Sequence, residues 1–162
     1  MILIDTNVLV YAIQEQDPHH ETSRKFVEAA TTGSPLACLF PQVLLEFYAV
    51  ITDSRRMEKP ATCAEGLDLI RRYSALIPVL HPSPASLDVL FSLIGDLDVR
   101  SQGIFDLHLV AQMMDAGVDT ICTYNTKHFT NHPVAARTPN EILGGIDRNA
   151  PPMVHDRRRA GR

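Results

Sequence analysis

Three carboxylates stand where acidic side chains could do chemistry. Asp5 directly follows a short apolar run at residues 1–4. Glu46 lies one step off the apolar stripe of a helical segment, and Asp106 stands near the start of another apolar segment. Singly, each has an ordinary structural role: Asp5 as a turn or cap residue, Glu46 as a solvated flank residue and Asp106 as a helix-start acid.

Their combination predicts a metal site. Carboxylates that converge repel one another, and some of them take up a proton. A hard divalent cation such as Mg²⁺ or Mn²⁺ removes this conflict, because oxygen ligands suit it. Such a metal turns bound water into a nucleophile at neutral pH and stabilises charge on a scissile phosphate. We therefore predict that Asp5, Glu46 and Asp106 bind Mg²⁺, with Mn²⁺ as a substitute.

Apolar periodicity predicts the elements that position these residues. The expected strands are residues 1–4, 36–39, 77–80, 120–123 and 134–137, and the expected helices are 8–13, 19–30, 41–53, 61–73, 85–94, 104–116 and 140–143. Asn7 is expected to cap the first helix and Gly117 to end the sixth. The alternation predicts an α/β fold whose parallel sheet is covered on both faces. Ligands bind beyond the carboxyl ends of such strands, where Asp5, Thr123 and Asn125 fall.

Composition narrows the class of protein. The 162 residues are 45% hydrophobic and 21% charged, which is typical of one soluble globular domain. The longest clean apolar run, residues 8–13, is too short to cross a bilayer, and the N-terminus does not resemble a secretory signal. The three cysteines have neither metal-ligand nor disulfide spacing, and the histidines lack zinc spacing. These features favour a cytoplasmic protein without membrane association.

Charge divides the chain into two parts. The net charge is −4, but residues 147–162 contain five Arg and two Asp, a net charge of +3. The remainder carries −7 and would bind nucleic acid poorly unless a cation neutralised its carboxylates. We expect a domain over residues 1–146 and a basic, disordered tail over residues 147–162.

Four motifs together resemble one known family, the PIN-domain ribonucleases. They are residues 2–10 (ILIDTNVLV), 44–47 (LLEF), 105–111 (FDLHLVA) and 121–129 (ICTYNTKHF). Their order and spacing match the family over residues 1 to about 146. The small size looks most like a VapC-type toxin of a type II toxin–antitoxin pair.

The resemblance implies a fold, an activity and partners. The fold would be a three-layer α/β/α sandwich with a mainly parallel sheet of about five strands. The activity would be metal-dependent endonucleolytic cleavage of RNA, often tRNA or rRNA. The partners would be a second copy of the chain in a homodimer and a small antitoxin protein that occupies the active-site groove.

The resemblance also implies roles for individual residues. Asp5, Glu46 and Asp106 would take the metal-binding places. Supporting residues would be Thr6 and Asn7, which orient Asp5 or a bound water, and Thr123, which hydrogen-bonds within the site. Asn125 would be the fourth catalytic residue, where many relatives carry Asp. Its neutral amide leaves a site charge of −3 and favours catalysis with one metal.

Other readings of the same sequence make different demands. A Mg-dependent phosphatase of the haloacid-dehalogenase type needs a second Asp two residues after Asp5, where this chain has Asn7. A signalling receiver domain needs a phospho-acceptor Asp after its third strand, and residues 77–82 supply none. A PIN-fold RNA-binding or regulatory module without catalysis stays open, because Asn125 departs from the family pattern.

Overall fold

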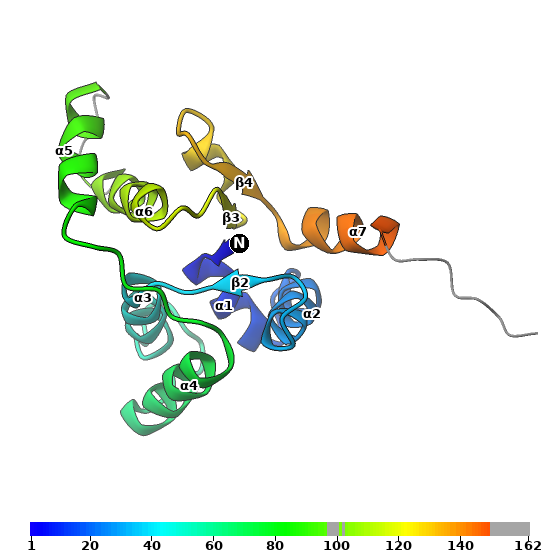
Figure 1. Cartoon of the computed structure of the whole chain (residues 1–162). Coiled ribbons are helices and arrows are strands. Elements are labelled where there is room, and N and C mark those ends of the chain that lie inside the picture. The colour runs from blue at the N-terminus through cyan, green and yellow to red at the C-terminus, as the bar shows by residue number, and fades with distance from the viewer. Residues whose placement is uncertain (97–100, 102, 150–162) are drawn as a thin grey trace, which may run out of the picture.

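A small parallel sheet forms the centre of the computed structural model, which describes residues 1–96, 101 and 103–149 (Figure 1). The strand order is β2-β1-β3-β4, and every pairing is parallel. The strands are β1 (Ile2–Ile4), β2 (Ala37–Cys38), β3 (Thr120–Cys122) and β4 (Ala135–Arg137). Leu3, Ile4 and Ile121 are fully buried, as expected of strands covered on both faces.

Helices surround the sheet. They are α1 (Thr6–Ile13), α2 (His20–Thr31), α3 (Pro41–Ile51), α4 (Cys63–Leu76), α5 (Ser86–Asp96), α6 (Gly103–Asp115) and α7 (Pro139–Asn149), with a 3₁₀ turn η1 (Thr126–Phe129). In the view of Figure 1, α5 and α6 lie to the upper left of the strands, α3 and α4 to the lower left, and α2 and α7 to the right. No helix in the described part of the chain is long and apolar enough to cross a membrane.

The core explains why these segments are helical. The apolar stripe of α3 puts Val43, Phe47 and Ile51 into the main core, where each is at most 1% exposed. Helix α5 packs differently, because its Leu90 joins Leu107 and Ala111 of α6 in a second, small cluster. Helix α6 therefore links the two clusters and is held on two sides.

The predicted α/β fold with a parallel sheet is confirmed, but the sheet has four strands instead of about five. Residues 77–80 make only an isolated bridge between Val79 and Leu39. Within it, the Leu39 N–H donates to the Pro78 carbonyl and the Leu80 N–H to the Leu39 carbonyl. Pro78 has no N–H to extend the pairing, which limits this segment to one bridge.

Two helix ends also differ from expectation. Helix α1 begins at Thr6 and its cap is Asp5, because the Asp5 carboxylate accepts the Thr6 N–H; Asn7 lies inside the helix. Helix α7 runs to Asn149, well beyond the short turn expected at residues 140–143. Most of the predicted basic tail, residues 150–162, lies outside the described residues, and the boundary at residue 146 stays a prediction.

Candidate active site

The Asp5 carboxylate is held by three hydrogen bonds at the point where β1 ends and α1 begins. Its Oδ1 accepts the Thr6 N–H at 2.6 Å. Its Oδ2 accepts the Asn7 side-chain amide at 2.7 Å and the Thr123 hydroxyl at 2.6 Å. Thr123 directly follows β3, whose Cys122 lies beside Ile4 in the sheet. Parallel pairing thus brings residues 118 positions apart into contact at the carboxyl ends of two strands.

Electrostatics links Asp5 to the two other predicted carboxylates. Burial raises the Asp5 pKa from 3.8 to about 6, and the hydrogen bonds from Thr123 and Thr6 oppose that rise. The negative charges of Glu46 and Asp106 raise the pKa further. All three predicted acids therefore contribute to one local field.

Two neutral donors hold Glu46. The Thr6 hydroxyl donates to Glu46 Oε2 at 3.1 Å, and the Gln42 side-chain amide donates to Oε1 at 2.9 Å. Glu46 is half-buried at the border of the apolar face of α3, where its spacing from Val43 and Val50 placed it. Thr6, the first residue of α1, joins both acids, since its N–H bonds Asp5 and its hydroxyl bonds Glu46.

Gln42 also connects α3 to α6. Its amide donates to the Phe105 carbonyl at 3.3 Å, and Gln112 donates to the Gln42 amide oxygen at 3.4 Å. Gln112 is only 8% exposed. Sequence reasoning missed this bridge; the available signal was the spacing of Gln42 and Glu46, four residues apart on one helical face.

Asp106 lies in the first turn of α6, as predicted, but its side chain is 40% exposed and does not point into the core. Leu107 and Val110 occupy the buried face instead. The Asp106 Oδ2 atom accepts a hydrogen bond from Nδ1 of His128 in η1 at 3.1 Å. Sequence reasoning treated His128 as a structural or surface residue, because no pattern linked the 3₁₀ turn to α6.

Thr123 is the centre of the remaining hydrogen bonds. It is fully buried, and its hydroxyl oxygen accepts the Asn7 amide and the Asn125 N–H, both at 3.0 Å, while it donates to Asp5. The Asn7 amide oxygen accepts the N–H of Tyr124 at 3.2 Å. Asn125 itself is exposed at the edge of this network.

The donor set suits a hard cation better than zinc. Carboxylate and amide oxygens of Asp5, Glu46, Asp106 and Asn125 are the candidates, and oxygen ligands are typical of Mg²⁺ and Mn²⁺. Across the described residues, no three His, Cys, Asp or Glu side chains are grouped closely enough to hold an ion as they stand. Glu46 is engaged by Gln42 and Asp106 by His128, so binding an ion requires these side chains to turn toward Asp5.

Comparison with known proteins identifies the family. The model of the PIN domain matches residues 2–133. This chain belongs to the PIN domain family. It is 27% identical over 134 residues to ribonuclease VapC24 of Mycobacterium tuberculosis, covering 81% of this chain and 90% of that protein. Ribonuclease VapC33 of the same organism is 25% identical over 113 residues, covering 68% of this chain and 79% of the relative.

Solved structures share the fold of this PIN domain. VapBC2 from Rickettsia felis, bound to a DNA fragment from its promoter, aligns with a TM-score of 0.62 and 17% identity over 85% of this chain and 98% of that one. Mycobacterium tuberculosis VapC20, described as a sarcin-ricin loop cleaving toxin, aligns with a TM-score of 0.59 and 16% identity over 79% and 92%. The predicted resemblance to PIN-domain proteins of the VapC type is confirmed.

Proposed function

We propose that this PIN-domain chain is a metal-dependent endoribonuclease that hydrolyses RNA phosphodiester bonds. The observation that carries the proposal is the Asp5 carboxylate, fixed by Thr6, Asn7 and Thr123 and raised in pKa partly by Glu46 and Asp106. A buried acid whose charge is opposed by two other acids favours a bound cation. The ribonuclease names of the VapC24 and VapC33 relatives support the reaction.

The residues of the chain divide the work of this site. Asp5, Glu46 and Asp106 would hold Mg²⁺ or Mn²⁺, and Asn125 would add a neutral oxygen at the exposed edge. Thr123, Asn7 and Thr6 keep Asp5 in one orientation. The Asp5 carboxylate therefore does not have to be ordered at the time of reaction. When bound, the metal supplies an activated water and stabilises charge on the scissile phosphate. The total ligand charge of −3 suits one divalent ion.

We also propose that the chain is the toxin of a VapBC-type pair and is inhibited by a small antitoxin protein. Solved structures similar in fold include VapBC2 of Rickettsia felis, VapBC-1 of Haemophilus influenzae and FitAcB of Neisseria gonorrhoeae. Their shared fold is consistent with this assignment, and RNA of the tRNA or rRNA class would be the target.

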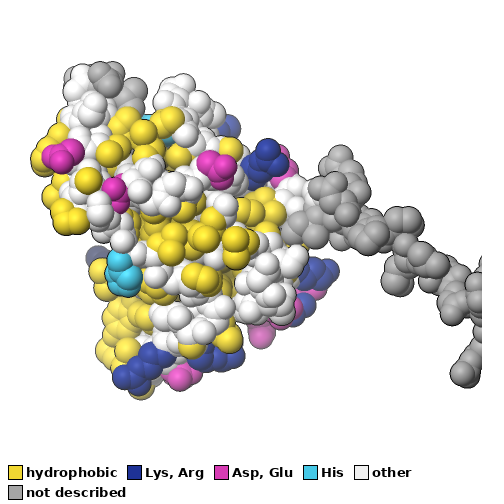
Figure 2. Space-filling view, in the orientation of Figure 1, with side chains coloured by type: hydrophobic (Ala, Val, Ile, Leu, Met, Phe, Trp, Pro, Cys, Tyr) yellow, Lys and Arg dark blue, Asp and Glu magenta, His cyan; other side chains and the backbone are white. Residues whose placement is uncertain are grey.

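A homodimer is part of the proposal. Large apolar side chains are exposed on α3 and α4, namely Leu45 at 69%, Leu76 at 53% and Leu67 at 44%. Apolar side chains also gather over the centre of the face shown in Figure 2, with Lys and Arg side chains near α4 at its lower edge. Exposed apolar surface of this kind is typical of surfaces that bind another protein chain.

The test is cleavage of labelled tRNA and rRNA by the purified chain in EDTA, Mg²⁺ or Mn²⁺. Cleavage that needs the metal, and that is lost in Asp5→Asn, supports the proposal. Asp88→Asn is the matched control, because Asp88 is an exposed acid in the first turn of α5. RNA binding without cleavage under every metal condition would instead favour the non-catalytic module that Asn125 left open.

A further inference from the structure

Three aromatic rings from separate parts of the chain form one cluster, which we call the aromatic platform: Tyr11 of α1, His19 before α2 and Tyr124 after β3. The ring centroids of His19 and Tyr124 are 4.1 Å apart, those of Tyr11 and His19 5.2 Å, and those of Tyr11 and Tyr124 5.3 Å. Nothing in the proposed metal chemistry uses these rings.

The aromatic platform adjoins the candidate active site. Tyr124 stands between Thr123 and Asn125 in the chain, and its N–H donates to Asn7, which itself bonds Asp5. Tyr11 lies four residues after Asn7 on α1 and therefore on the same side of that helix. The aromatic platform therefore lies beside a residue that holds Asp5.

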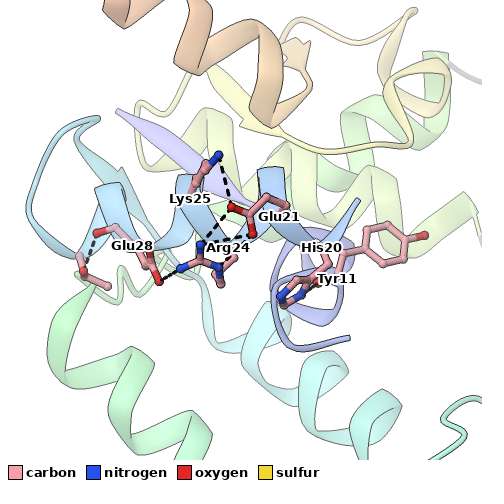
Figure 3. Close-up of polar contacts among 7 residues, drawn as sticks. Tyr11, His20, Glu21, Arg24, Lys25 and Glu28 are labelled. Atoms are coloured by element: carbon pink, nitrogen blue, oxygen red, sulfur yellow. Dashed lines mark hydrogen bonds and ion pairs between the residues drawn. The ribbon is translucent and has the colours of Figure 1, made fainter. Parts of the chain in front are cut away.

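Hydrogen bonds hold the Tyr124 ring and the backbone of Tyr11 in place. The Tyr124 hydroxyl pairs with Ser23 at 2.9 Å, and Ser23 is fully buried. His20 bonds the Tyr11 carbonyl at 3.0 Å, which ties α1 to α2 (Figure 3). His19 is exposed, and Tyr11 and Tyr124 are partly exposed. Rings ordered in this way lose little conformational entropy when a ligand stacks on them.

The Arg and Lys side chains of α2 are paired with acids, and the charge of Asp17, which acts on Tyr124, makes the surroundings of the aromatic platform negative. Arg24 pairs with Glu21 and Glu28, and Lys25 pairs with Glu21, all on α2. In Figure 3 the Tyr11 ring points away from this ladder of ion pairs. The surface therefore offers ring faces rather than free cations, which suits a base better than a phosphate.

We propose that the aromatic platform stacks an unpaired base of the RNA beside the scissile phosphate. This inference rests on the proposed ribonuclease function and deepens it by assigning these three rings the contact with a base beside the scissile phosphate. Proteins that read RNA in loops and ends stack unstacked bases on aromatic side chains, and a base inside a duplex cannot be reached in this way. His19 is the most exposed residue of the three.

The test measures binding without cleavage. The probes are a fluorescein-labelled single-stranded RNA of about 12 nucleotides and the duplex of the same sequence, with anisotropy read in Ca²⁺, a hard cation that offers the carboxylates a counter-charge. His19→Ala should weaken single-strand binding roughly 10-fold and leave duplex binding unchanged. His81→Ala is the matched control, since His81 is also an exposed histidine and lies between α4 and α5.

Rescue by a ring separates stacking from a charge contact. His19→Phe should bind the single strand as the wild type does, whereas His19→Lys should not. Tyr124→Phe should retain most binding, because it keeps the ring and loses only the hydroxyl contacts with Ser23 and with the His19 carbonyl. Three results would each overturn the platform. They are an unchanged affinity of His19→Ala for the single strand, binding that is restored by His19→Lys but not by His19→Phe, and a wild type that does not bind the single strand.

The same variants distinguish this inference from the nuclease proposal. A wild type that cleaves RNA with metal while His19→Ala binds normally would overturn only the platform. If single-strand binding depends on the ring but the chain never cleaves RNA, only the nuclease proposal is overturned. The melting temperature of each variant confirms that it is folded. This control matters most for His19→Ala, which changes a surface residue.

Discussion

The fold opposes ionisation of the Asp5 carboxyl. Its pKa of about 6, against an ordinary 3.8, means that the folded chain favours the protonated form. Its stabilising contribution is therefore complete below about pH 4 and is lost as the pH rises through 6. The loss is on the order of 3 kcal/mol in the free energy of unfolding.

Denaturant unfolding in EDTA between about pH 4 and pH 7 measures this loss. Asp5→Asn should remove that part of the pH dependence, because it has no proton to lose. Asp119→Asn, an exposed acid before β3, should keep the wild-type profile. An Asp5→Asn profile that parallels the wild type would show that another group carries the effect.

Asp106 tests the metal site most directly. Asp106→Asn keeps the shape of the side chain and removes one of three repelling charges, while the exposed pair with His128 contributes little. The variant should melt at or above the wild-type temperature without metal and lose most metal-induced stabilisation. RNA cleavage by the variant should fall by orders of magnitude. Expression of the wild type should slow cell growth, and expression of the variant should not.

Asp88→Asn on α5 serves as the control for Asp106→Asn in each of these assays. It should retain metal-induced stabilisation, cleavage and growth inhibition. Near-normal metal-dependent cleavage by Asp106→Asn would remove Asp106 from the ligand set.

At the scale of elements, Gln42 couples the two helices that carry Glu46 and Asp106. Gln42→Ala removes a donor to Glu46 and the contact to the Phe105 carbonyl of α6. Loss of such outer contacts typically lowers metal affinity 10- to 100-fold. Calorimetric titration with Mn²⁺ should show this loss, and Gln16→Ala, at an exposed position after α1, should not. Equal affinities for the two variants would mean that Glu46 needs no positioning.

The sequence predicted those parts of the elements that depend on local patterns. The apolar run of β1, the stripe of α3 and Gly117, whose φ is +66°, all fall as expected. It failed where a tertiary partner decided the outcome. Residues 77–80 had strand composition, but only Leu39 was available for pairing beside Pro78.

The same division holds for the site. Asp5 and Thr123 were placed from their positions after strands, because parallel strands end at one edge of the sheet. Contacts of Gln42 with Gln112, and of His128 with Asp106, join segments with no shared pattern. The aromatic platform was missed for the same reason, since its rings are spread from residue 11 to residue 124.

At the scale of the whole molecule, the prediction concerns the homodimer. If α3 and α4 form the dimer interface, Leu45→Glu should convert the dimer to a monomer, because it puts a charge into a dry apolar contact. Leu87→Glu, at an exposed position on α5, should leave the dimer intact. Sedimentation at micromolar concentration distinguishes the two species. A wild type that sediments only at 18.0 kDa would contradict the dimer.

The bond between Asp5 and Thr123 has a consequence for how the chain is made. Asp5 leaves the ribosome before Thr123, its hydrogen-bond partner, which lies 118 positions later. Until β3 emerges, a nascent chain lacks the hydroxyl that fixes Asp5 and the strand that pairs with the far side of β1. The candidate site therefore stays incomplete on the ribosome until β3 has been synthesised.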